Sequence, residues 1–130
     1  MTQSKAMMSL RVPGKKEFAL VIRTALSGAA VLMDLDMDTL DDLRTAADEA
    51  CDCLIHQSRK VREVEVKVYE GESTMLVTLE ADFEDAGEGA GAPEIEITRA
   101  VLETLAAQVD VVCEPCGLVR RIDLTMARAA

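Results

Sequence analysis

Four cysteines and one histidine have spacings that could hold a metal ion. Cys51-x-Cys53-x-x-His56 and Cys113-x-x-Cys116 carry thiol and imidazole groups, which are ligands that zinc prefers. Cys113 and Cys116 flank a predicted tight turn, as pairs of zinc-binding cysteines often do. Cys51 and Cys53, however, would point about 200° apart on a helix and could not both face one ion. The pattern therefore favours free thiols, with a metal or redox site as the less favoured alternative.

Glu49 and His56 are candidates for acid–base catalysis. Both fall on one stripe of a predicted helix, together with Asp42 and Cys53. A carboxylate or an imidazole can move a proton when it reaches the reacting hydroxyl. A solvated helix face explains Glu49 equally well, and a partly exposed place at a helix end is more usual for a lone histidine. The residues alone therefore leave catalysis open.

The overall charge restricts the class of partner. The 130 residues include 24 acidic and 14 basic side chains, which gives a formal net charge of −10. Such a surface repels phosphate, so we expect no direct binding to nucleic acid or to an anionic membrane. It suits a basic protein partner, although solubility alone also accounts for it. Because the N-terminus is polar and no apolar run approaches the roughly 20 residues that span a bilayer, the sequence indicates a cytoplasmic protein with reduced cysteines.

The apolar pattern predicts a single domain over residues 1–130, with residues 1–7 loosely ordered. A short strand over 8–12 precedes a helix whose apolar face runs from Phe18 to Leu32. A second helix, capped by Asp38 or Thr39, extends from Leu40 to about Ser58. The rest of the chain reads as a hairpin over 64–68 and 75–81, a small-residue acidic loop over 84–93, a third helix from about Glu94, and a hairpin over 109–113 and 118–126.

The predicted helices are amphipathic, and each must bury its apolar stripe. The first helix has further apolar positions that should leave it largely buried: Leu20, Val21, Leu26 and Val31. Gly28 in the same helix would let a neighbouring helix approach closely. The third helix is expected to bury Ile97, Val101, Leu102 and Leu105. Three helices on one face of a mostly antiparallel sheet bury such stripes, so the sequence predicts an α+β two-layer sandwich.

The second predicted helix carries a segment that resembles a known family. From Leu43 to His56 it is similar to the helix with the Glu-x-x-x-Asn motif in bacterial anti-sigma-factor serine kinases of the RsbW/SpoIIAB type. Leu10-Arg-Val-Pro and the segments 22–28 and 101–109 resemble that family's opening strand, first helix and last helix. The resemblance extends over about residues 8–126 and implies the histidine-kinase-like ATPase fold.

The resemblance implies roles for four positions. Glu49 matches the family's general base toward serine, and Cys53 stands where an asparagine oxygen ligates Mg²⁺. A thiol is a poor ligand for this hard cation. Glu80 matches the residue that hydrogen-bonds the adenine amino group. Asp82 puts a charged side chain where a glycine admits the base.

The phosphate-binding glycines of the family differ here as well. The matching residues 96–98 read Glu-Ile-Thr, and Gly87, Gly89 and Gly91 precede them in an acidic loop. Carboxylates there would repel phosphate. The resemblance therefore implies a degenerate nucleotide pocket for which no cofactor is expected, with ATP and Mg²⁺ bound only if the pocket is retained.

The resemblance also implies a function. We expect an anti-sigma regulatory factor that controls transcription by binding a sigma factor or its anti-anti-sigma (STAS-type) antagonist. Members of the family often dimerise, which makes a homodimer one expectation here. The alternative is an active ATP-dependent serine/threonine kinase that acts on an anti-anti-sigma factor, with Glu49 as the base.

Overall fold

The computed structural model describes residues 5–84 and 95–128. The strands are β1 (Met8–Pro13), β2 (Val61–Glu70), β3 (Thr74–Phe83), β4 (Gln108–Cys113) and β5 (Val119–Ala127). The helices are α1 (Ala19–Leu32), preceded by the short 3₁₀ helix η1 (Lys16–Phe18), α2 (Met37–Ile55) and α3 (Ile95–Leu105). This order confirms the prediction. The predicted loop over 84–93 and loose N-terminus over 1–7 lie mostly outside the described residues, although the Met7 backbone donates a hydrogen bond to Val68.

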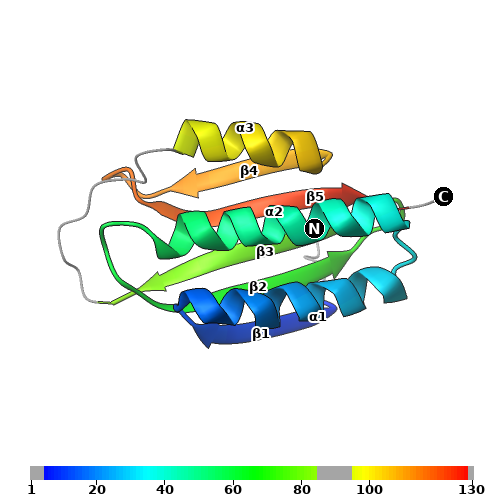
Figure 1. The fold of residues 1–130 in the computed structure, drawn as a ribbon, viewed down its shortest axis with the longest axis horizontal. Helices are drawn as coiled ribbons and strands as arrows, with labels where there is room; N and C mark the ends of the chain where they lie inside the picture. The colour runs from blue at the N-terminus through cyan, green and yellow to red at the C-terminus, as the bar shows by residue number, and fades with distance from the viewer. Residues whose placement is uncertain (1–4, 85–94, 129–130) are drawn as a thin grey trace.

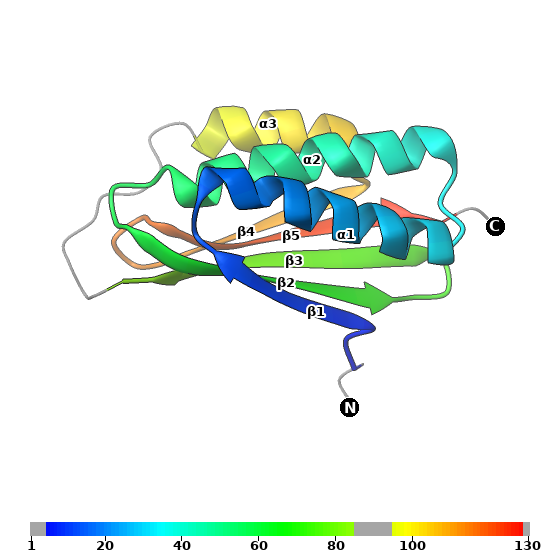
Figure 2. The same ribbon diagram turned by 60° about the horizontal axis from the view of Figure 1, so that its bottom comes forward.

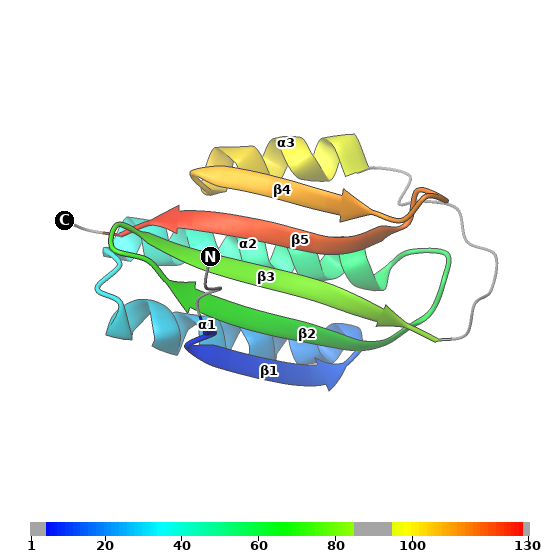
Figure 3. The ribbon, with the colours of Figure 1, turned by 180° about the vertical axis from the view of Figure 1, so that it is seen from behind.

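The five strands form one sheet in the order β1-β2-β3-β5-β4, and every neighbouring pair is antiparallel. The helices lie on one face, with α1 above β1 and β2, α2 above the middle strands and α3 above β4 (Figure 1). Seen from the side, they form a single layer over the sheet (Figure 2). None of the described helices covers the opposite face (Figure 3). The structure therefore confirms the α+β two-layer sandwich.

The core lies between α2 and the middle of the sheet. Alternate residues of β2 and β3, from Val64 to Val68 and from Met75 to Leu79, are fully buried. Above them α2 presents an aliphatic stripe made of Leu40, Leu43, Ala46, Ala47, Ala50, Cys51 and Leu54. The intervening strand residues face the helix-free side, as the two-residue period of a strand requires. Within the described part of the chain, every helix lacks the length or the apolar character that crossing a membrane demands.

Predictions of burial in the two outer helices are partly wrong. Leu20, Val21 and Val31 of α1 are exposed, as is Ile97 of α3. Each of these helices lies at one end of the helix layer and has only α2 beside it (Figure 2), so one side of its apolar surface stays uncovered. Nothing described approaches Gly28 either, because a Cβ added there would meet no atom within 4 Å.

Both ends of α2 also differ from the prediction. The N-cap is Asp36, rather than Asp38 or Thr39, and its carboxylate accepts a 2.8 Å hydrogen bond from the Thr39 backbone N–H. This bond lowers the pKa of Asp36, because it favours the charged form. The helix ends at Ile55, before the predicted end at Ser58.

Gln57, just beyond the end of α2, is a buried polar residue that ties the helix layer to the sheet. Its amide oxygen accepts a 2.7 Å hydrogen bond from the Val119 N–H, and its amide nitrogen donates to the Val119 carbonyl, also at 2.7 Å. The β3–β5 ladder ends at the pair of Glu80 and Arg121. The Gln57 side chain therefore takes the place of a strand beside Val119 and satisfies both of its backbone groups.

Replacing Gln57 by leucine should destabilise the fold. The substitution keeps the side-chain volume but leaves the buried N–H and C=O of Val119 unpaired. Since each of these two unpaired groups costs about 1–3 kcal/mol, the free energy of unfolding in urea should fall by about 2–6 kcal/mol. The control is Gln108→Leu at the exposed start of β4, which should change it by less than about 0.5 kcal/mol. Equal losses in the two variants would contradict this role for Gln57.

Candidate functional site

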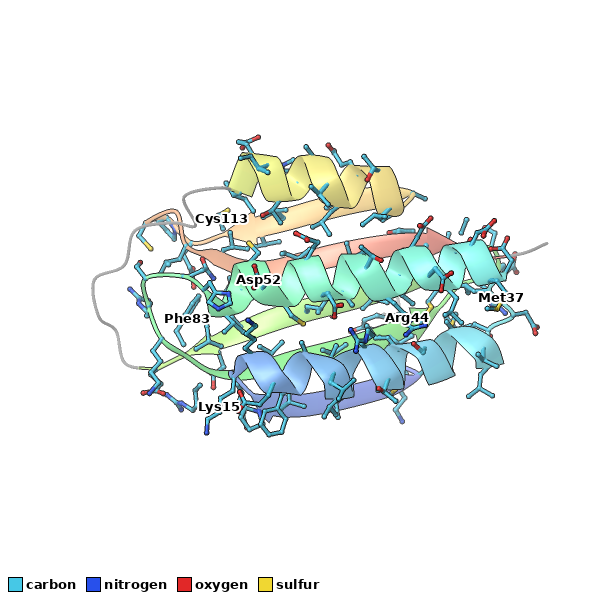
Figure 4. The ribbon with its side chains drawn as sticks, in the orientation of Figure 1. Lys15, Met37, Arg44, Asp52, Phe83 and Cys113 are labelled. Atoms are coloured by element: carbon cyan, nitrogen blue, oxygen red, sulfur yellow. The ribbon has the colours of Figure 1, made fainter. Side chains whose placement is uncertain are left out.

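A cleft of about 610 Å³ lies between η1 with the first half of α1 and the second half of α2. We call it the α1–α2 cleft. A smaller hollow of about 220 Å³ continues the groove between the two helices. Arg23 and Asp48 line both hollows and so stand between them. In Figure 4, Lys15 marks the side of the cleft at the start of α1, Asp52 marks the side at the end of α2, and Arg44 lies along the continuing groove.

The floor of the cleft is apolar. It is formed by Ala19, Cys51 and Ile55, and the exposed Leu20 completes the apolar lining. Cys51 is 1% exposed, and burial, with smaller contributions from Asp48 and Asp52, raises its pKa to about 12. The thiol is therefore neutral at physiological pH and acts as part of the hydrophobic surface.

The rim of the cleft and the continuing groove is acidic. Its carboxylates belong to Glu17, Asp41, Asp48, Glu49 and Asp52, and its cationic side chains to Lys16, Arg23 and Arg44. Three contacts order this rim, one of them the pair of Arg44 and Asp41 at 3.9 Å. Arg23 Nη1 lies 2.9 Å from Asp48 Oδ2 across the two helices, and His56 Nδ1 lies 2.8 Å from Asp52 Oδ1. The excess of carboxylates attracts a positively charged group.

Glu49 and Cys53, the two α2 residues of the predicted nucleotide pocket, lie one turn apart on the same face of the helix, as predicted, but have different surroundings. Glu49 is exposed, lines the cleft and makes no ion pair with any described residue. Cys53 is half-buried and faces α3, where the nearby side chain of Thr98 partly offsets the effect of burial on its pKa. Burial raises the pKa of Cys53 to about 11, which keeps the thiol neutral and unsuited to a hard cation.

Glu80 and Asp82 lie on the other side of the sheet from Glu49 and Cys53. Ala81, between them on β3, is buried under the helices at 5% exposure, so its neighbours face the helix-free side. Glu80 pairs there with Arg120 at 2.8 Å, and Asp82 lies 3.9 Å from Arg62. The structure therefore brings Glu49 and Cys53 onto one helix but does not bring Glu80 and Asp82 to them.

The phosphate-binding segment of the predicted pocket is described only in part. Gly87, Gly89 and Gly91 lie outside the described residues. Of residues 96–98, the first two are exposed at the start of α3, and Thr98 is half-buried near Cys53. In place of the family's glycines, the described part of this segment therefore has the exposed carboxylate of Glu96.

The cysteines are free and do not converge on one point. Cys51 faces the core and Cys53 faces α3, as their predicted separation on the helix requires. Cys113 and Cys116 are exposed at the β4–β5 turn; Cys113 is labelled in Figure 4. Among the described residues, no three His, Cys, Asp or Glu side chains are arranged so that they could hold a metal ion. The structure thus gives the metal hypothesis no support.

The ion pair between Arg23 and Asp48 was not found from the sequence. The two residues are 25 positions apart on different helices, and no local spacing connects them. One signal was available, because Arg23 is the single charged residue between Ala19 and Leu32. A lone charge in an apolar helix is favourable where a partner of opposite charge faces it.

The four thiols should separate into two reactive and two slow ones. Cys113 and Cys116 are exposed, whereas Cys51 and Cys53 are shielded and have raised pKa values. Because the thiolate is the nucleophile, an aromatic disulfide reagent at mildly alkaline pH should modify two thiols of the folded protein quickly and all four only after unfolding. Replacing Cys113 and Cys116 by serine should remove the fast phase. Fast modification of a third thiol would contradict this assignment.

No family model matches the chain, and no curated protein is significantly similar to it. Its function is therefore inferred from the α1–α2 cleft, from the charge of the chain and from the resemblance carried by α2.

Proposed function

We propose that this chain is a regulatory protein-binding domain of the anti-sigma-factor type, which controls transcription in the cytoplasm by holding a sigma factor or its STAS-type antagonist. The observation that carries the proposal is the α1–α2 cleft, which combines an apolar floor with an acidic rim. The resemblance of α2 to the corresponding helix of the anti-sigma-factor kinases gives the class of partner.

The shape and chemistry of the cleft suit a segment of another protein. The groove follows two neighbouring helices, so an extended or helical segment can lie along it. Ala19, Leu20 and Ile55 would contact its apolar side chains, while the carboxylates of the rim would pair with its Lys and Arg side chains. Electrostatic attraction of this kind speeds association and selects for a basic partner over an acidic one.

Three observations support binding over ATP turnover. Glu80 and Asp82 are separated by the sheet from Glu49. Cys53 presents a neutral thiol where the family has a Mg²⁺ ligand. The net charge of −10 also repels a triphosphate. Phosphoryl transfer depends on positioned metal ions and on charge neutralisation, so the proposal includes lost or weakened nucleotide binding.

The alternative function is a serine/threonine kinase that acts on an anti-anti-sigma factor. One observation favours it: Glu49 is an exposed carboxylate in a cleft and has no ion-pair partner among the described residues. Calorimetric titration with ATP and ADP, with and without Mg²⁺, separates the two functions. Mg²⁺-dependent binding, and phosphate transfer to a STAS-type protein that is lost in Glu49→Ala, would make the kinase the function. No detectable heat is what the binding domain predicts.

A purified sigma factor or STAS-type antagonist from the same organism should bind this chain in a salt-dependent way, measured by surface plasmon resonance. The double variant Glu49→Lys, Asp52→Lys reverses two exposed charges of the rim and should weaken binding roughly tenfold or more, mainly through slower association. The control is Glu72→Lys in the exposed β2–β3 turn, which should bind as the unmodified chain does. If no such protein binds, or if both variants bind equally well, the proposal is wrong.

A further inference from the structure

The contact between Arg23 and Asp48 divides the groove between α1 and α2. Both side chains line the α1–α2 cleft of about 610 Å³ and the hollow of about 220 Å³ that continues it. Arg23 belongs to α1 and Asp48 to α2, and Arg23 Nη1 lies 2.9 Å from Asp48 Oδ2. The pair therefore bridges the groove from one wall to the other. A segment that lies along the whole groove has to displace Arg23.

Three aspartates of α2 follow the groove, and each has a cationic or ionisable side chain close to it. Asp41, Asp48 and Asp52 recur at intervals of seven and four residues, which places them on one face of the helix. Arg44 lies 3.9 Å from Asp41, and His56 lies 2.8 Å from Asp52 (Figure 4 labels Arg44 and Asp52). Both of these partners belong to α2 itself. Of the three contacts, the one at Asp48 is the one that crosses to α1.

The contact of Arg23 with Asp48 adds little to the stability of the fold. The side chain of Arg23 is 33% exposed and that of Asp48 is 43% exposed. Ion pairs with this exposure stabilise a protein weakly, because water screens both charges. The buried apolar face of α1, which includes Ile22 and Leu26, holds the helix in place instead. The contact can therefore open at little cost while both walls of the groove stay where they are.

We propose that Arg23 occupies, in the free chain, the place beside Asp48 that a cationic side chain of the partner takes in the complex. This exchange rests on the proposed binding function and adds the residue that selects the partner. When the partner's cation pairs with Asp48, Arg23 turns toward solvent and the two hollows join into one groove. A segment without a cation at this position cannot replace Arg23 and meets a divided groove.

Arginine is the partner side chain that suits this place best. The position of Arg23 shows that a guanidinium group reaches Asp48 at hydrogen-bond distance. A guanidinium pairs with a carboxylate through a planar fork of N–H groups, whereas the ammonium group of lysine is a point charge. Ala19 and Ile55 line the cleft beside this place and offer apolar contacts. The segment that fits the groove therefore carries an arginine with apolar residues on either side of it.

Two synthetic peptides test the exchange with the full chain. Both are the same amphipathic, leucine-rich helix, but one has a central arginine and the other has citrulline, its neutral isostere, at that position. By fluorescence anisotropy, the unmodified chain should bind the arginine peptide more tightly than the citrulline peptide. Arg23→Gln should bind the arginine peptide about two- to fivefold more tightly still, because the internal competitor is gone. Arg23→Lys, which keeps the charge, should lose most of this gain.

The matched control is Arg44→Gln. It removes the same charge from the same groove but opens nothing, because Arg44 faces Asp41 on its own helix. It should raise the affinity for the arginine peptide less than Arg23→Gln does. In an Asp48→Asn background, Arg23→Gln should give no gain, because the carboxylate that both cations share is missing. Equal gains in the two single variants, or a gain that survives in Asp48→Asn, would overturn the exchange.

The proposed function and the exchange can fail separately. If neither a sigma factor nor a STAS-type antagonist binds, but the arginine peptide shows the gain in Arg23→Gln, the class of partner is wrong and the exchange stands. If such a protein binds through the rim and Arg23→Gln behaves as Arg44→Gln does, the function stands and the exchange is wrong. An arginine peptide that does not bind, or that binds no better than the citrulline peptide, also contradicts the exchange.

Discussion

The pairing of Gln57 with the backbone of Val119 fixes the helix on which the rest of the structure depends. α2 lies between α1 and α3 and covers the middle of the sheet, so its position sets the positions of both neighbours. Hydrophobic contacts along the apolar face of α2 keep the helix against the sheet. Because these contacts are not directional, they would still allow the helix to slide along the sheet. Two 2.7 Å hydrogen bonds to one residue of β5 remove that freedom. They hold the C-terminal half of α2, which carries Asp48, Asp52 and Ile55, as one wall of the cleft.

The sequence predicted the elements well because their signals are local. Alternating residues and turn-forming residues identified the strands, and the 3.6-residue pattern identified the helices. Burial was predicted less well, because the width of an apolar stripe says nothing about how many neighbours a helix has. α1 and α3 have apolar residues that a central helix would bury, but both lie at the ends of the layer. The N-cap of α2 was missed because Asp36 and Asp38 both satisfy the capping rule, and only the backbone geometry chooses between them.

The candidate site was predictable only where its residues belong to one helix. Glu49 and Cys53 are four residues apart, and their place on α2 follows from helix geometry. Whether Glu80 and Asp82 can reach Glu49 depends on which face of the sheet they occupy. A shift of one residue in the pairing of β3 would move both side chains to the opposite face. The burial of Ala81 settles that register in the folded chain. The contact of Arg23 with Asp48 depends on how two helices cross, which no spacing within either helix reveals.

α1 has a charged contact with α2 on one side and an uncharged, exposed apolar face on the other. Its single charge, Arg23, is drawn to Asp48 and helps to order the acidic rim, which leaves the outer face without charge. The acidic groove attracts cations, whereas Val21, Val31 and Leu32 are exposed on the uncharged outer face. Leu20 belongs to both, since it lines the cleft and is also 58% exposed at one end of the outer face of α1. If a partner in the α1–α2 cleft buries Leu20, less apolar area therefore remains on the outer face of α1, and the reverse also holds.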